Sequence, residues 1–88
     1  MLRLLTHKNL LNSYEGALKS NAKYFAIVVS INGDEEIIIN KMDAVKEHKL
    51  EYWLKTYDQG LAHVNNSNIR ITGITYGDTF DSIEKDLM

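Results

Sequence analysis

A tight β-hairpin is the feature that most constrains what this chain can fold into. Residues 24–40 read YFAIVVSINGDEEIIIN, in which two apolar, β-branched runs flank Asn32-Gly33. An Asn-Gly pair tolerates the positive φ angles that a type I′ turn requires at both central positions. The pattern therefore predicts two antiparallel strands joined by a two-residue turn.

The first strand of this hairpin is expected in the middle of a sheet. Its apolar residues occupy both parities, with Phe25, Ile27 and Val29 on one face and Ala26 and Val28 on the other. A strand that is apolar on both faces is typically covered from both sides by other elements. We therefore expect neighbours on each face of this strand.

Apolar residues at helical spacing predict a helix before the hairpin, a longer one after it and a short one at the C-terminus. Thr6 is a candidate N-cap for the first helix, and Ser20-Asn21 is a natural stop. Asn40 or Asp43 can cap the second helix, which is expected to reach about Tyr57. The expected apolar, core-facing stripes are Leu10, Leu11, Tyr14, Ala17 and Leu18 in the first helix and Leu50, Trp53, Leu54 and Tyr57 in the second. Near the C-terminus, Phe80, Ile83, Glu84 and Leu87 follow helical spacing.

A third strand is predicted from Asn68 to Tyr76, after a loop at residues 65–68. Ile74 falls on the opposite parity to the isoleucines before it, and Gly73 is placed where a β-bulge restores the phase. Residues 2–4 alternate in a way compatible with a short N-terminal strand. The expectation is one small α+β domain over residues 1–88, with a three-stranded, mainly antiparallel sheet in the order α-β-β-α-β-α.

Composition excludes several classes of protein. Twelve acidic against ten basic residues give a net charge of −2, which makes direct nucleic-acid binding through a basic surface improbable. The chain has no cysteine, so neither a disulfide nor a thiolate metal site is available. No apolar run is long enough for a membrane span or for the core of a signal peptide. A cytoplasmic protein without a membrane association is expected.

Residues that carry chemistry are scattered along the sequence. His7, His48 and His63 do not have the spacing of metal ligands, so no metal site is predicted. The turn at residues 77–79 places an aspartate where a phosphate would otherwise bind, and a helix cap explains it. With no nucleophile motif and no isolated carboxylate pair, we predict no cofactor, no catalytic residue and no enzymatic activity.

Two acidic groups and one tyrosine are the candidate contacts for a partner. Solvated loops and helix ends also account for the acids, whereas an exposed aromatic side chain is more typical of an interface. Tyr52 lies off the expected core stripe of its helix, beside Lys49 and Lys55. The full candidate set is Asp34, Glu35, Glu36, Tyr52, Asp78, Asp81 and Glu84.

Four segments together resemble small uncharacterised accessory proteins of phages and prophages of Gram-positive bacteria: LTHKNLL, the YFAIVV…EEIIIN hairpin, KLEYWLKTYD and ITGITYGDTFDSIE. These segments are structural signatures, so the resemblance supplies no functional residue. It implies a protein made inside an infected bacterium that binds and modulates a host protein, including inhibition of a defence system such as CRISPR.

Two alternatives remain open at this point. The chain can be a structural module that associates with itself, since a three-stranded sheet leaves two edges that pair across a two-fold axis. It can also bind nucleic acid weakly through Lys46, Lys49 and Lys55 on the second helix.

Overall fold

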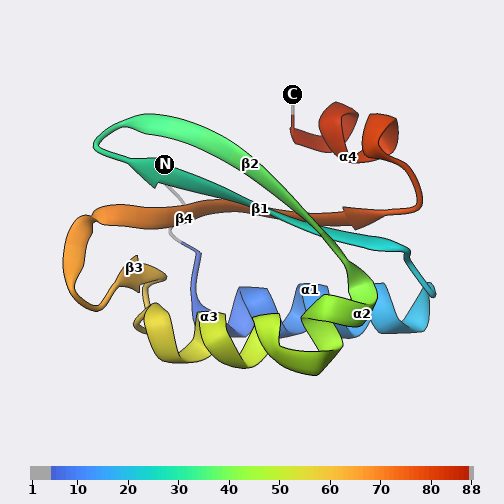
Figure 1. The fold of residues 1–88 in the computed structure, drawn as a ribbon, viewed down its shortest axis with the longest axis horizontal. Coiled ribbons are helices and arrows are strands. Elements are labelled where there is room, and N and C mark those ends of the chain that lie inside the picture. The colour runs from blue at the N-terminus through green and yellow to red at the C-terminus, as the bar shows by residue number, and fades with distance from the viewer. Residues whose placement is uncertain (1–4, 88) are drawn as a thin grey trace.

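A four-stranded antiparallel sheet lies between two long helical segments on one side and a short helix on the other (Figure 1). The computed structural model describes residues 5–87, so the strand suggested by residues 2–4 lies outside the described part. The strand order is β2-β1-β4-β3. The elements are α1 (His7–Lys19), β1 (Tyr24–Ile31), β2 (Asp34–Lys41), α2 (Met42–Ala44), η1 (Val45–Lys49), α3 (Leu50–Thr56), β3 (Ala62–His63), β4 (Asn66–Gly77) and α4 (Phe80–Leu87).

The predicted hairpin and its turn are confirmed. β1 and β2 pair without a register shift from Ile31–Asp34 at the turn to Tyr24–Lys41 at the other end. Asn32 and Gly33 have φ angles of 53° and 92°, which are the positive values of a type I′ turn. β1 also pairs with β4, so it lies inside the sheet as its two apolar faces predicted.

The sheet has four strands rather than the three expected. β3 contains only Ala62 and His63, which is too short for an alternating pattern to reveal. It pairs with β4 across a turn at residues 64–65, so β4 begins at Asn66, two residues earlier than predicted. The expected polar loop at residues 65–68 is therefore mostly strand.

The predicted bulge lies next to Gly73. Val28 pairs with Gly73 and Val29 pairs with Ile71, so Thr72 is the extra residue in β4. This shift brings Ile74 to the same face of the sheet as Ile71. Both isoleucines contact the main core, which explains why the chain needs the bulge.

α1 begins and ends where the sequence predicts. Thr6 is the N-cap, and its backbone N–H donates to the Asn9 side-chain oxygen at 2.9 Å. The helix ends before Asn21, which has a φ of 55°. Two expected core residues of this helix, Leu11 and Leu18, are exposed, because the buried stripe through Leu10 and Ala17 is narrower than predicted.

The second helical segment runs from Met42 to Thr56, with a π-helical turn, η1, between α2 and α3. Neither Asn40 nor Asp43 is its N-cap. Lys41 holds that position without a side-chain hydrogen bond, because β2 continues to Lys41 and passes directly into the helix. The Met42 N–H is instead satisfied by the Lys23 carbonyl at 2.9 Å.

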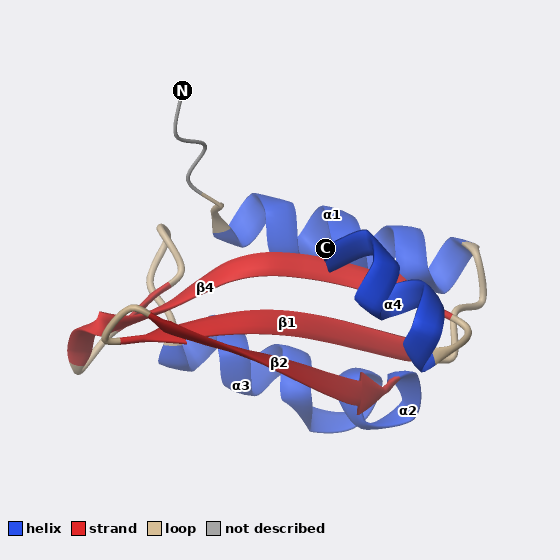
Figure 2. Ribbon diagram, turned by 90° about the horizontal axis from the view of Figure 1, so that it is seen from above, coloured by secondary structure: helices blue, strands red, loops and turns tan. Residues whose placement is uncertain are grey.

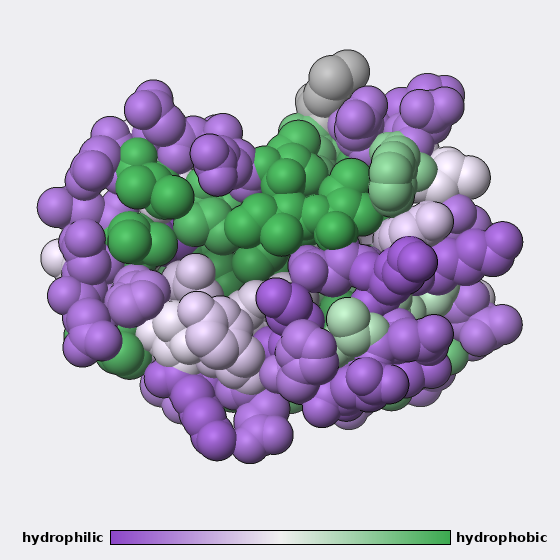
Figure 3. Space-filling view, in the orientation of Figure 1, coloured by the Kyte–Doolittle hydropathy of each residue, from purple (hydrophilic) through white to green (hydrophobic). Residues whose placement is uncertain are grey.

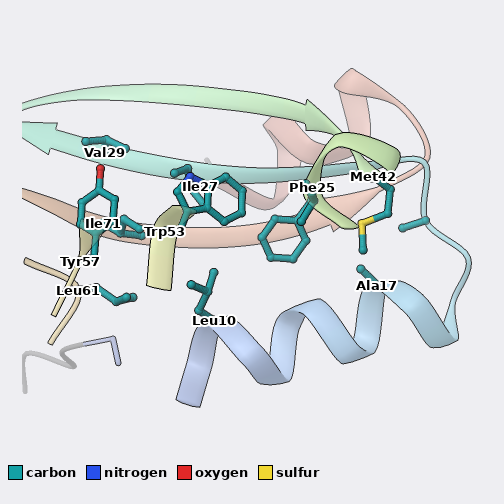
Figure 4. Packing of buried hydrophobic residues seen from close by; sticks show 12 residues of the cluster. Leu10, Ala17, Phe25, Ile27, Val29, Met42, Trp53, Tyr57, Leu61 and Ile71 are labelled. Atoms are coloured by element: carbon teal, nitrogen blue, oxygen red, sulfur yellow. The ribbon is translucent and has the colours of Figure 1, made fainter. Parts of the chain in front are cut away.

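The main core lies between the sheet and the two helical segments, as Figure 4 shows. Phe25 of β1 stacks on Trp53 of α3, with ring centroids 5.7 Å apart. Trp53 and Tyr57 are buried, as predicted for the second helix. Leu10 of α1 is fully buried in the same cluster, so both helical segments are fixed to the sheet by one set of contacts.

Candidate functional site: the outer face and the edge of the sheet

α4 lies on the face of the sheet that is turned away from α1 and α3, here called the outer face (Figure 2). Its Ile83 is fully buried, while Phe80 is 54% exposed and packs edge-on against Tyr24, with ring centroids 4.9 Å apart. α4 has eight residues and covers only one end of this face. The outer face is therefore partly open.

A shallow hollow of about 260 Å³ lies on the outer face beside the end of α4. Gly73 belongs to its floor, because a Cβ at this position would come within 3.0 Å of a Val28 methyl group. Ile37 of β2, which is 46% exposed, forms part of the wall. The complete lining is Val28, Glu35, Ile37, Thr72, Gly73 and Leu87.

One polar contact crosses this hollow. The Thr72 hydroxyl of β4 donates to a carboxylate oxygen of Glu35 on β2 at 2.8 Å. β1 lies between these two strands, so the hydrogen bond spans the width of three strands. Thr72 is the extra residue of the bulge, and the bulge is predictable from the sequence. Its contact with Glu35 is not, because the two residues are 37 positions apart.

β2 forms one edge of the sheet and is the most exposed apolar strand. A band of apolar surface follows it in Figure 3. Ile37 and Ile38 are 46% and 41% exposed, although three isoleucines in succession are typical of a buried strand. Natural edge strands usually carry a bulge, a proline or a central lysine, and β2 has none of these.

The two predicted acidic groups lie at opposite ends of the sheet. Residues 34–36 follow the hairpin turn, whereas Asp78, Asp81 and Glu84 lie in and before α4, beside the other end of β1. The eight residues of β1 separate these ends by about 23 Å, at about 3.3 Å per residue. All six acids are exposed, and within one chain they form two separate surfaces.

Tyr52 does not join either acidic group. Its side chain is 55% exposed, as expected, but α3 lies on the opposite side of the sheet from α4. Beside it, Lys55 pairs with Glu51 at 2.9 Å. The hydrogen bond in this pair lowers the pKa of Glu51 and raises the pKa of Lys55. The predicted contact residues therefore do not form one surface.

A second hollow, of about 310 Å³, lies where β2 passes into α2. It brings together Lys23, Lys41 and Lys46, with Asp43 among them, which the separate positions of these lysines in the sequence did not suggest. Asn40 lies at the same end of β2. Its side-chain nitrogen is buried and has no hydrogen-bond partner among the described residues.

Side chains that could ligate a metal ion are not gathered within residues 5–87. No three side chains of His, Asp or Glu in this range lie close enough to share a metal ion. The His7 ring is held by a 2.7 Å contact between its Nε2 and the Tyr57 carbonyl oxygen. The phenol of Tyr57 is partly buried, which raises its pKa. No helix in the described range has the length and apolar character that crossing a membrane requires.

No family model, curated protein or solved structure matches this chain.

Proposed function

We propose that the chain is a non-enzymatic accessory protein of phage type that binds and modulates a host protein through the outer face of its sheet. The observation that carries this proposal is the partly covered outer face, where an apolar hollow lies open beside α4. Contiguous exposed apolar surface with a polar rim is typical of a protein-binding site. Its one carboxylate, from Glu35, is bound by Thr72, a role that is structural and not catalytic.

The charges around this face favour a partner with a basic surface. Residues 32–37 contain three acids and no base, and residues 77–87 contain four acids and one lysine. These acids are exposed, and only Glu35 and Asp86 among them accept a side-chain hydrogen bond, from Thr72 and Thr75, within the described residues. Proteins that bind nucleic acid present such basic surfaces, and a CRISPR effector nuclease is a host protein of this kind.

Phage protection in a bacterium with an active CRISPR system tests this proposal. The wild-type chain should raise plaque numbers, and the double reversal Asp81→Lys with Glu84→Lys, at two exposed positions of α4 on the outer face, should abolish the protection. A matched control reverses Glu15 and Glu47, which are also exposed but lie on the helices of the other side. Binding of the purified effector should follow the same order.

Two outcomes would contradict the proposal. Absence of protection by the wild-type chain, together with absence of effector binding, removes the proposed function. Equal loss of protection in the control pair would show that total charge matters and that the outer face does not. Circular dichroism of each variant separates these results from unfolding.

A further inference from the structure

We infer that the β2 edge binds the β2 edge of a second copy of this chain, in an antiparallel register centred on Ile38. Two four-stranded sheets would then join into one sheet of eight strands, with the outer faces on the same side. This inference stands on β2 alone and does not depend on the host partner proposed above.

Along the outer edge of β2, the backbone has N–H and C=O groups that no strand within residues 5–87 pairs. In a two-residue hairpin, hydrogen-bonded and non-hydrogen-bonded pairs alternate from the pair that flanks the turn, here Ile31 and Asp34. The even-numbered residues of β2 therefore bond to β1, a phase that continues in the Met42 N–H bond to the Lys23 carbonyl. The odd-numbered residues direct their N–H and C=O groups outward: Glu35, Ile37, Ile39 and Lys41.

Charge complementarity selects the second copy as the occupant of this edge. Residues directly opposite each other in an antiparallel pair point to the same face of the sheet, so two copies of β2 must pair odd with odd and even with even residues. The two-fold axis that relates the copies therefore passes through a residue and not between two residues. Centred on Ile38, the axis places Glu35 opposite Lys41 of the second copy, and does so twice. It also places Ile37 opposite Ile39, so that apolar residues meet only apolar residues along the middle of the interface.

The neighbouring registers lack this match. Centring on Ile37 places Glu35 opposite Ile39 and leaves Lys41 opposite the hairpin turn. Centring on Ile39 places Ile37 opposite Lys41 and brings Glu35 towards Asp43. In both registers a charged residue faces an isoleucine and no opposite charges meet, so both are less favourable across adjacent strands. The register centred on Ile38 is therefore the one that the sequence of β2 favours.

Asn40 gives an independent reason for the same register. Its side-chain nitrogen is buried and finds no hydrogen-bond partner within residues 5–87, an arrangement that is destabilising in a folded chain. With the axis at Ile38, the residue opposite Asn40 is Glu36 of the second copy, whose carboxylate is an acceptor for that nitrogen. Glu36 and Asn40 occupy the same face of β2.

The pairing also changes where the acidic residues lie. In one chain the acids of the hairpin and of α4 are at opposite ends of the sheet. In the dimer, the hairpin of one copy lies beside the end of β2 in the other, where Lys41 pairs with Tyr24 and Tyr24 with Gly77. Three strand spacings of about 4.8 Å then separate the two acidic groups, or about 14 Å.

Single cysteine variants test the register, because the chain has no cysteine of its own. Ile38→Cys places two thiols on the axis in a non-hydrogen-bonded pair, with Cα atoms about 4.5 Å apart, a separation that a disulfide can span. Ile37→Cys is the matched control. Its two copies are offset by two positions along the strands, which puts their Cα atoms beyond the limit of about 7 Å.

After mild oxidation, we expect Ile38→Cys to form at least tenfold more covalent dimer than Ile37→Cys. A mixture of Ile37→Cys and Ile39→Cys should cross-link between the two variants. Cross-linking of Ile37→Cys alone, or of neither variant, would overturn the register. The dimer would be overturned if the wild-type chain remained monomeric in sedimentation at micromolar concentration. It would also be overturned if the β2 amides were protected from hydrogen exchange only by a different protein.

Discussion

The Thr72 hydroxyl and the Glu35 carboxylate, 2.8 Å apart, connect the bulge of β4 to the exposed edge strand β2. The bulge turns Thr72 towards the outer face, and the hydrogen bond holds Glu35 over the hollow. Only one of the two carboxylate oxygens is used by Thr72, so the other is free to accept from Lys41 of a second copy. A local irregularity in one strand thus positions a charge on another.

Removing this hydroxyl should have a small and specific effect. We expect Thr72→Val to lower the free energy of unfolding by about 0.5–1 kcal/mol, because the exposed hydrogen bond is lost while the shape is retained. Chemical denaturation measures the change. Thr72→Ser keeps the hydroxyl and should stay closer to the wild type, and an order opposite to this would contradict the assignment.

Substitution of Gly16 is expected to destabilise the protein because of a steric contact, although helix propensity alone predicts the opposite. Propensity alone predicts that Gly16→Ala stabilises α1 by about 1 kcal/mol. A Cβ at Gly16, however, would lie 2.7 Å from the Tyr76 hydroxyl oxygen and 3.2 Å from the adjacent ring carbon. We expect a net loss of about 1–3 kcal/mol from overpacking.

The Tyr76→Phe background separates these two effects. Without the hydroxyl, the shortest contact disappears, so the penalty for Gly16→Ala should fall. The four proteins form a double-mutant cycle by urea denaturation. A stabilising Gly16→Ala in the wild-type background would show that Tyr76 moves away at little cost.

The hairpin turn provides a test in which no side-chain contact is involved. Gly33 has a φ of 92°, and a Cβ there would meet nothing within 4 Å. Gly33→Val should therefore destabilise the protein through the backbone alone, by at least about 1 kcal/mol. Gly33→Asn is the matched control, because asparagine tolerates positive φ, and it should lose clearly less. Equal melting temperatures for all three chains would contradict the type I′ turn.

Tyr57 should make the stability depend on pH in the alkaline range. Burial raises the pKa of its phenol, and Tyr52 nearby raises it further. The neutral phenol is therefore favoured by folding, and its contribution is complete below about pH 10, the pKa of an unfolded tyrosine. That contribution is lost as the pH rises through the higher value of the folded chain.

Unfolding measured from about pH 9 to about pH 11 tests this dependence. Tyr57→Phe should lose less stability over that range than the wild type. The control Tyr52→Phe removes an exposed phenol and should keep most of the wild-type slope. Parallel profiles for the wild type and Tyr57→Phe would contradict the assignment.

Much of the fold followed from local patterns in the sequence. The turn at Asn32-Gly33, the interior place of β1, the N-cap at Thr6 and the bulge beside Gly73 each depend on neighbouring residues, and all four are confirmed. β3 was missed because two residues contain no period. Lys41 replaced the predicted N-caps because its pairing with Tyr24, a contact distant in sequence, extends β2.

The candidate site was less accessible to such reasoning. The acids were recognised as groups, but their separation by the length of β1 depends on how the strands pair. The exposure of Ile37 and Ile38 was not expected either, because a run of isoleucines is the same in an edge strand as in a buried one. β1 and β2 are both apolar, and β2 is the edge strand because β4 pairs with the other side of β1.

Charge exchange across the β2 edge shows whether this edge is a specific contact surface. In sedimentation velocity, Glu35→Lys and Lys41→Glu should each weaken self-association tenfold or more, because each places like charges opposite one another. An equimolar mixture of the two variants places opposite charges together again in the register centred on Ile38. We predict that the mixture recovers the dimer of the wild type. A mixture that remains monomeric while the wild type dimerises, or single variants that dimerise unchanged, would show that Glu35 and Lys41 do not meet across this edge.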